Sequence, residues 1–239
     1  MYQFGPGVPQ NYTEAAKWFR LAAEQGDADG QNMLGLLYHE GHGVPQNYAE
    51  AAKLFRLAAN QGEASAQHML GVMYLKGHGV PQNYAEAVKW YRLAAEQGDA
   101  EAQTNLGFMH YNGQGVPQSY AEAVKWFGLA ADQGHAKAQL SLGLMHYNGQ
   151  GVPQNYTEAV KWFRLAADQG DAKAQFNLGF MHYNGQGVPQ NYVLAHMWSN
   201  LASAGGVQDA SKNRDRVASK MSSAQIAEAQ RLAASWKPK

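Results

Sequence analysis

Apolar residues recur along the chain with the period of an α-helix. In one segment they fall three or four positions apart, at Tyr84, Ala87, Val88, Tyr91, Ala94 and Ala95. Such spacing places them on one helix face that a core would cover. A second stripe follows at Ala102, Leu106 and His110. The pattern predicts a helix A over about 84–97 and a helix B over about 100–111.

The same pattern returns every 36 residues. The tetrapeptide Gly-Val-Pro-Gln begins at positions 7, 43, 79, 115, 151 and 187, and segments 115–150 and 151–186 are identical at 29 of 36 positions. A fixed period of this length indicates a repeat array. We therefore expect one array over residues 1–239, with a degenerate last repeat and a C-terminal capping helix. The predicted boundaries are 7–42, 43–78, 79–114, 115–150, 151–186, 187–221 and, for the capping helix, 222–239.

Local signals mark the ends of each helix pair. Asn83 precedes helix A and Glu86 stands three residues later, which predicts a capping box. The same box is expected at Asn11/Glu14, Asn47/Glu50, Ser119/Glu122 and Asn155/Glu158, but not at Asn191. Gly98 can close helix A in the left-handed conformation, and Asp99 can cap helix B.

Each helix B also carries a glycine in its interior. These glycines stand at Gly35, Gly71, Gly107, Gly143 and Gly179. Glycine costs roughly 1 kcal/mol relative to alanine inside a helix, so its recurrence predicts a close contact with another helix. Because two helices alone cannot bury such stripes, neighbouring pairs must stack.

Composition excludes several classes of protein. The 19 basic and 19 acidic residues balance and are not gathered in blocks, so we expect no nucleic-acid partner. The absence of cysteine excludes disulfides, thiolate chemistry and cysteine-based metal sites. No apolar run reaches about 20 residues, so we expect no membrane insertion.

Seven elements of the repeat carry a resemblance to a known family. They are Ala87, Trp90-Tyr91, Ala94-Ala95, Gln97-Gly98, Ala102-Gln103, Leu106-Gly107 and Gly113-x-Gly115-Val116. This pattern resembles the Sel1-like repeat. The resemblance implies an all-α, right-handed α/α superhelical solenoid related to tetratricopeptide arrays, a platform for protein partners found commonly in bacteria. Some bacterial relatives clamp each pair with a disulfide, which this chain cannot form, so their link to penicillin-like ligands is not carried over.

Both ends of the chain are atypical. Met1 to Gly5 aligns with the end of a helix B, which suggests that the array begins within a repeat. At the other end, Ser222 and Gln225 predict a capping box before a helix that runs to about Trp236. The compartment is left open between the cytoplasm and, if an upstream signal is missing, the periplasm or outside of the cell.

Histidines and glycine-rich loops offer no catalytic or metal site. His110, His146 and His182 occupy one repeat position. Packed helices lie about 8–10 Å apart, whereas zinc ligands lie about 2 Å from the metal, so these histidines are interpreted as satisfied, half-buried packing residues. The Gly-x-Gly loops are interpreted as turns. We expect no metal, no cofactor and no catalytic residue.

A cationic set on helix A is the leading candidate for partner binding. It comprises Lys17, Arg20, Lys53, Arg56, Lys89, Arg92, Lys125, Lys161 and Arg164. If helix A lines the concave side, these cations can pair with carboxylates of a peptide. The alternative is a solvated face on which Glu14 pairs with Lys17 and Arg20 holds Glu24. Gly128 replaces the arginine in the fourth repeat.

Helix B offers a second candidate surface. The most variable position holds Asn32, His68, Thr104, Leu140 and Phe176. Leu140 with Leu144, and Phe176 with Phe180, form apolar pairs one turn apart. They indicate either an exposed interface or packing onto the following helix.

The sequence thus favours a non-enzymatic scaffold that binds protein or peptide partners on the concave helix-A surface. Two alternatives stay open: a hydrolase or small-molecule-binding protein with a pocket between repeats, and a redundant member of a recently duplicated set.

Overall fold

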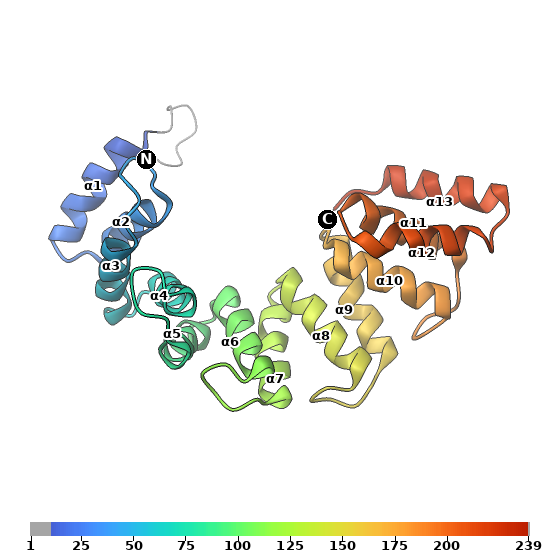
Figure 1. Ribbon diagram of the computed structural model, residues 1–239, viewed down its shortest axis with the longest axis horizontal. Coiled ribbons are helices and arrows are strands. Elements are labelled where there is room, and N and C mark those ends of the chain that lie inside the picture. The colour runs from blue at the N-terminus through green and yellow to red at the C-terminus, as the bar shows by residue number, and fades with distance from the viewer. Residues whose placement is uncertain (1–10, 239) are drawn as a thin grey trace. The chain divides into compact units, whose positions relative to one another are not determined.

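The computed structural model describes residues 11–238, which fold into thirteen α-helices without a β-strand (Figure 1). The helices are α1 (Tyr12–Glu24), α2 (Ala28–Glu40), α3 (Tyr48–Asn60), α4 (Ala64–Lys76), α5 (Tyr84–Glu96), α6 (Ala100–Asn112), α7 (Tyr120–Asp132), α8 (Ala136–Asn148), α9 (Tyr156–Asp168), α10 (Ala172–Asn184), α11 (Tyr192–Ala204), α12 (Gln208–Ala218) and α13 (Ser223–Ser235). The predicted helices A and B correspond to α5 and α6.

Helix pairs recur with the predicted period. The odd-numbered helices from α1 to α11 each begin at a tyrosine, 36 residues after the one before. The chain is therefore an all-α solenoid, as expected. Its superhelical handedness stays a prediction.

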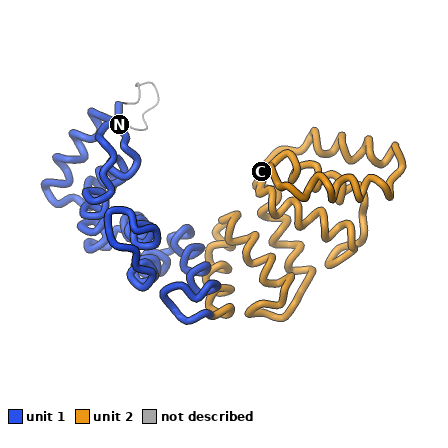
Figure 2. The backbone as a smooth tube through the Cα atoms, viewed as in Figure 1, with its two compact units in different colours: residues 1–118 blue, residues 119–239 orange. Residues whose placement is uncertain are grey.

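The chain forms two compact units, residues 1–118 and residues 119–239 (Figure 2). The first holds α1–α6 and the second holds α7–α13. The boundary follows the fourth Gly-Val-Pro-Gln, so each unit contains whole helix pairs. The proposed alignment of Met1 to Gly5 falls outside the described residues, and the single array over 1–239 stays a prediction.

The predicted N-cap at Asn47 forms, but its backbone N–H bonds to a different acceptor from the one expected. Asn47 Oδ1 accepts the N–H groups of Ala49 and Glu50, both at 3.1 Å. The N–H of Asn47 donates to the Tyr38 carbonyl at 2.9 Å, while Glu50 pairs with Lys53 at 3.8 Å. The predicted capping box at Asn47/Glu50 is therefore wrong in its second bond, because the preceding helix already satisfies the cap.

Among the described helices, only α13 carries both bonds of a capping box. Gln225 N donates to Ser222 Oγ at 3.3 Å, and Ser222 N donates to Gln225 Oε1 at 2.9 Å. This confirms the prediction at the C-terminal end. Helix α13 packs on α11, where the rings of Trp236 and Trp198 meet edge to face with centroids 6.2 Å apart.

Interior glycines of helix B admit aromatic rings from the next helix A. A Cβ built on Gly35 would lie 2.8 Å from Phe55, and one on Gly143 would lie 2.7 Å from Phe163. The expected close contact is confirmed at these positions. The predicted core stripe of α5 is buried except for Tyr84, which is 37% exposed. The assignment of Tyr84 to the core is therefore wrong, whereas Tyr48 and Tyr156, at the first position of α3 and α9, are half-buried against core clusters.

Paired glutamines join neighbouring repeats. In each pair, the glutamine that follows a helix A bonds to a glutamine of the preceding helix B. Gln97 Nε2 donates to Gln67 Oε1 at 2.8 Å and to the Gly62 carbonyl at 3.0 Å. Gln67 is buried and itself donates to the Ala59 carbonyl at 3.2 Å. Equivalent pairs are Gln61 with Gln31 and Gln169 with Gln139. These bonds satisfy buried polar groups that the helix ends leave open.

Within residues 11–238, no helix is both long and apolar enough to cross a bilayer.

Candidate partner-binding face

Within each unit the first helices of the repeats turn one face outward, and we call this face of α1, α3 and α5 in the first unit, and of α7 and α9 in the second, the helix-A face. It carries the predicted cationic set. All nine side chains of the set are exposed. The core stripe of each helix holds the opposite face inward, so the 3.6-residue period alone directs these lysines and arginines to solvent.

Four of the five lysines of the set have local acidic partners. Lys17 lies 2.6 Å from Glu14, and Lys161 lies 3.5 Å from Glu158. Lys53 and Lys125 pair with Glu50 and Glu122 in the same way. The Glu14–Lys17 pair predicted from the sequence is thus confirmed. Exposed pairs of this kind contribute at most about 1 kcal/mol, so they leave the lysines able to exchange partners.

Three of these lysines also lie over tryptophan rings. The Nζ atoms of Lys89, Lys125 and Lys161 lie 5.3, 5.1 and 5.2 Å from the ring centres of the tryptophans that follow them. A cation over an indole face is attracted by the ring quadrupole. Their ammonium groups are therefore held close to the protein surface.

Two of the four arginines contact tyrosines of helix B. Arg20 donates to the Tyr38 hydroxyl at 3.1 Å, and Arg56 donates to the Tyr74 hydroxyl at 2.7 Å. The Arg56 guanidinium also lies 5.9 Å from the centre of the Tyr74 ring. The predicted contact of Arg20 with Glu24 is wrong, because the tyrosine 18 residues later on the neighbouring helix supplies the acceptor instead.

Exposed leucines run beside the cationic set at one repeat position, and we call them the leucine column. They are Leu21, Leu57, Leu93, Leu129 and Leu165, which are 50, 45, 38, 44 and 41% exposed. Sequence reasoning missed them, although their strict 36-residue recurrence next to the arginine position was visible. Exposed apolar side chains at fixed spacing are typical of interaction surfaces.

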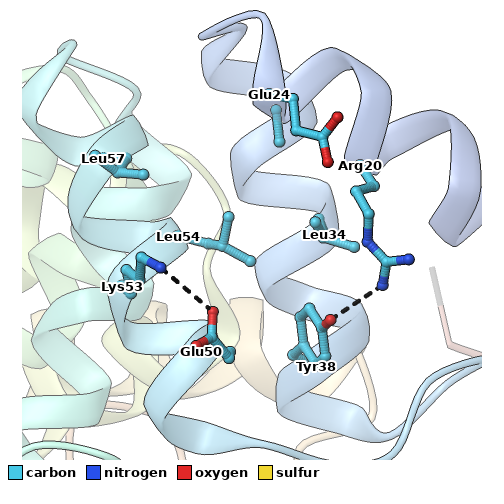
Figure 3. Close-up of a pocket in the computed structure, with 9 residues that line it drawn as sticks. Arg20, Glu24, Leu34, Tyr38, Glu50, Lys53, Leu54 and Leu57 are labelled. Atoms are coloured by element: carbon cyan, nitrogen blue, oxygen red, sulfur yellow. Dashed lines mark hydrogen bonds and ion pairs between the residues drawn. The ribbon is translucent and has the colours of Figure 1, made fainter.

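The first unit has a groove of about 260 Å³ on this face (Figure 3). It lies between α1 and α3, with α2 contributing Leu34 and Tyr38. Arg20 points toward Tyr38 on one side, and Lys53 points toward Glu50 on the other (Figure 3). The groove thus combines an apolar lining with charged groups of both signs. The complete lining is Arg20, Ala23, Glu24, Leu34, Tyr38, Glu50, Lys53, Leu54 and Leu57.

The second unit has a groove of about 340 Å³ along α9. It brings Lys161 together with Arg164 beside Leu165 and Val188. The two grooves therefore unite two pairs of the cationic set, Arg20 with Lys53 and Lys161 with Arg164. The five other members lie outside these two grooves, four in the first unit and Lys125 in the second: Lys17, Arg56, Lys89, Arg92 and Lys125.

The recurring histidines are buried more deeply than expected. His110 and His182 are only 7 and 4% exposed, whereas His146 is half-buried as predicted. His146 Nδ1 is buried without a hydrogen-bond partner, so the expectation that it is satisfied is wrong. Burial first, and then the charge of Arg164, lowers the pKa of His182. In the described part of the chain, no group of three or more histidine or acidic side chains is placed to hold a metal ion.

The apolar stripe of helix B is divided between core and surface. Leu140 packs against the core cluster around Phe163, which agrees with the packing interpretation at that position. Phe176 is half-buried, and Leu144 is 37% exposed. The stripe is therefore less exposed than the leucine column.

Comparison with known proteins gives one family. The model of the Sel1 repeat matches residues 1–27, 28–63, 64–99, 100–135, 136–171 and 172–207. From the second match onward these boundaries fall at the starts of α2, α4, α6, α8 and α10. Among curated proteins, none matches this chain.

Solved structures of Sel1 repeat proteins resemble the chain closely. A protective antigen of uropathogenic Escherichia coli with an SLR fold is 36% identical, with a TM-score of 0.88 over 98% of this chain and 51% of the antigen. The chain thus spans about half the length of that antigen. A Sel1 repeat protein from Oxalobacter formigenes is 32% identical, with a TM-score of 0.81 over 95% of this chain and 92% of the other.

A more distant structure, a putative Sel1 repeat protein from Klebsiella pneumoniae, is 22% identical, with a TM-score of 0.54 over 85% of this chain and 99% of the other, and shares the fold. The repeat matches cover most of the sequence, and the two nearer structures share its helices almost throughout. The chain belongs to the Sel1 repeat family.

Proposed function

We propose that this protein is a non-enzymatic scaffold that binds a segment of a protein partner along the helix-A face. Sel1 repeats generally serve as platforms for protein interactions. The observation that carries the proposal is the leucine column, in which the same residue of the first five repeats is 38–50% exposed.

The leucine column supplies the affinity in this proposal. Leu21, Leu57 and Leu93 belong to the first unit and stand at one position of three successive first helices. Burying apolar surface is worth about 25 cal/mol per Å², so each leucine covered by a partner adds on the order of 1 kcal/mol. Several such contacts in register offset the cost of ordering a bound segment.

The cationic set supplies orientation. Tyr38 and Tyr74 hold the guanidinium groups of Arg20 and Arg56 in place, while both arginines stay exposed. Their remaining N–H groups can donate to carboxylates or backbone carbonyls of a partner. Because these donors are already ordered, less side-chain entropy is lost on binding.

The test is affinity capture from the source cell, followed by titration of the purified partner against variants of the full chain. Leu57→Glu and Leu93→Glu each place a charge in the leucine column. Asn112→Glu introduces the same charge at an exposed position at the end of α6. We expect the two leucine variants to weaken partner binding about tenfold or more, roughly 1.4 kcal/mol or more, and Asn112→Glu to leave it unchanged.

The cationic set is tested separately with the double variant Lys89→Glu and Arg92→Glu. We expect weaker binding of the same partner and a smaller dependence of its affinity on salt. If all variants bind the partner as the parent does, the helix-A face is not the binding surface and the proposal fails.

A further inference from the structure

The fourth repeat has a glycine where the first, second, third and fifth repeats carry an arginine and the sixth carries Asn200. Gly128 lies inside α7, and a Cβ built on it would have no atom within 4 Å. By contrast, a Cβ on Gly143 would lie 2.7 Å from Phe163. Close packing therefore does not require glycine at position 128, although it costs roughly 1 kcal/mol of helix propensity relative to alanine.

In three of these repeats the arginine interacts with the aromatic residue that stands 18 positions later on the following helix. Arg20 and Arg56 bond to tyrosine hydroxyls, and the positive charge of Arg164 acts on His182. The equivalent ring in the fourth repeat is His146 on α8. Its Nδ1 has no hydrogen-bond partner, and no arginine of its own repeat lies beside it. Gly128 thus leaves open the position from which an arginine side chain reaches the tyrosine of the following helix in the first and second repeats.

The charges around this space favour a cation. Asp132 follows Gly128 by one helical turn on the same face of α7 and is exposed. From α9, Glu158 and Lys161 act on His146 with opposite signs and lie 3.5 Å from each other. The surroundings therefore hold two carboxylates and one ammonium. At the corresponding place in the first repeat, Glu24 and Glu50 stand with two cations, Lys53 and Arg20.

We propose that the space left by Gly128 beside His146 binds an arginine side chain of a protein partner. The proposal rests on the proposed function of the helix-A face and specifies the chemistry that one repeat recognises. A planar guanidinium fits beside an aromatic ring and forms directed hydrogen bonds to a carboxylate, and Asp132 and Glu158 offer such acceptors. The shorter, strongly hydrated ammonium of lysine matches this arrangement less well.

The test uses an acetylated and amidated Gly-Arg-Gly peptide as the probe, with the full chain. Nuclear magnetic resonance of the His146 imidazole reports its occupancy and its pKa. We expect saturable shifts of the His146 signals and a lower His146 pKa when the peptide is bound. A matched peptide with citrulline, which keeps the shape but lacks the charge, should bind about tenfold more weakly, about 1.4 kcal/mol.

Two substitutions at one position complete the test. Gly128→Arg restores the arginine of the first, second, third and fifth repeats, so it should abolish binding of the peptide and lower the His146 pKa of the free protein. Gly128→Ala leaves most of the space open and should bind the peptide as the parent does. Equal binding of the arginine and citrulline peptides, or unchanged binding by Gly128→Arg, would overturn the proposal. If Leu57→Glu weakens partner binding but Gly128→Arg does not, the proposed function holds and the arginine site fails.

Discussion

The ring of Tyr91 in α5 lies against the backbone of Gly71 in α4, so closely that a Cβ built on Gly71 would fall 2.6 Å from Tyr91 Cδ1. Phe55 and Phe163 occupy the same place against Gly35 and Gly143. The tightest packing thus joins helix B of one repeat to helix A of the next. The matched Sel1 repeats, which begin at helix B, therefore group these two helices in one repeat, whereas repeats counted from the Gly-Val-Pro-Gln motif divide them.

Gly71→Ala is expected to destabilise the protein. The new methyl group would overlap the Tyr91 ring, and overpacking of this kind costs typically about 1–3 kcal/mol. The gain in helix propensity returns at most about 1 kcal/mol. Urea unfolding followed by circular dichroism should show a lower free energy of unfolding than that of the parent.

Gly128→Ala is the matched control, since it makes the same change in a helix interior where a Cβ meets no atom. It should raise the free energy of unfolding by up to about 1 kcal/mol through helix propensity alone. If both alanine variants are stabilised to the same degree, the contact between Gly71 and Tyr91 does not restrict the packing.

Tyr91→Phe is expected to stabilise the protein. The Tyr91 side chain is fully buried, and its hydroxyl has no hydrogen-bond partner. Burial accordingly raises the pKa of this hydroxyl. Removing an unsatisfied buried hydroxyl recovers on the order of 1 kcal/mol of desolvation cost.

Thermal unfolding of Tyr91→Phe should therefore show a higher midpoint than the parent. Tyr74→Phe serves as the comparison, because the Tyr74 hydroxyl accepts a hydrogen bond from Arg56. Its midpoint should stay the same or fall. A lower midpoint for Tyr91→Phe would show that the hydroxyl is satisfied in solution.

Stability is expected to decrease as the pH falls below about 6.5. Burial lowers the pKa of His182 and of His196 from this ordinary value, and the charges of Arg164 and Arg214 lower them further. Below pH 6.5 the unfolded chain therefore binds protons that the folded chain does not yet bind. The stability that the two neutral histidines contribute should be fully present above pH 6.5. It should be lost as the pH falls from there through their lower folded-state pKa values.

His182→Tyr isolates one part of this dependence, because Tyr38 and Tyr74 stand at the same repeat position. The variant should lose less stability than the parent between pH 7 and pH 5, measured as the difference in urea midpoints. An identical pH profile for both proteins would mean that protonation of His182 does not contribute.

Sequence predicted most of the fold because its signals are local and repeated. The caps at Asn47 and Asp99, the turn at Gly98 and the periodic stripes each act within a few residues. The predicted bond between the Glu50 side chain and the N–H of Asn47 does not form, because the carbonyl of Tyr38 on the preceding helix already accepts that N–H. A single repeat read by itself does not contain that acceptor.

The candidate site was predicted only in part for a similar reason. Periodicity correctly directed Arg20 and Lys53 outward, but it could not show that Arg20 bonds to Tyr38 on another helix. Leu57 was overlooked because an apolar residue in an amphipathic helix is usually assigned to the core. Its exposure depends on where the neighbouring helices stop covering it, which is a tertiary property.

The glutamine pairs give the last prediction, a loss of stability in Gln97→Ala. The substitution removes the donor that satisfies Gln67 Oε1, and Gln67 is only 4% exposed. An acceptor left unpaired in the interior costs about 1–3 kcal/mol, so the urea midpoint should fall clearly. Gln25→Ala changes the same repeat position after α1, where the side chain makes no hydrogen bond among the described residues, and its midpoint should match the parent. Equal midpoints for the two variants would mean that Gln67 finds another donor, such as water, once Gln97 is removed.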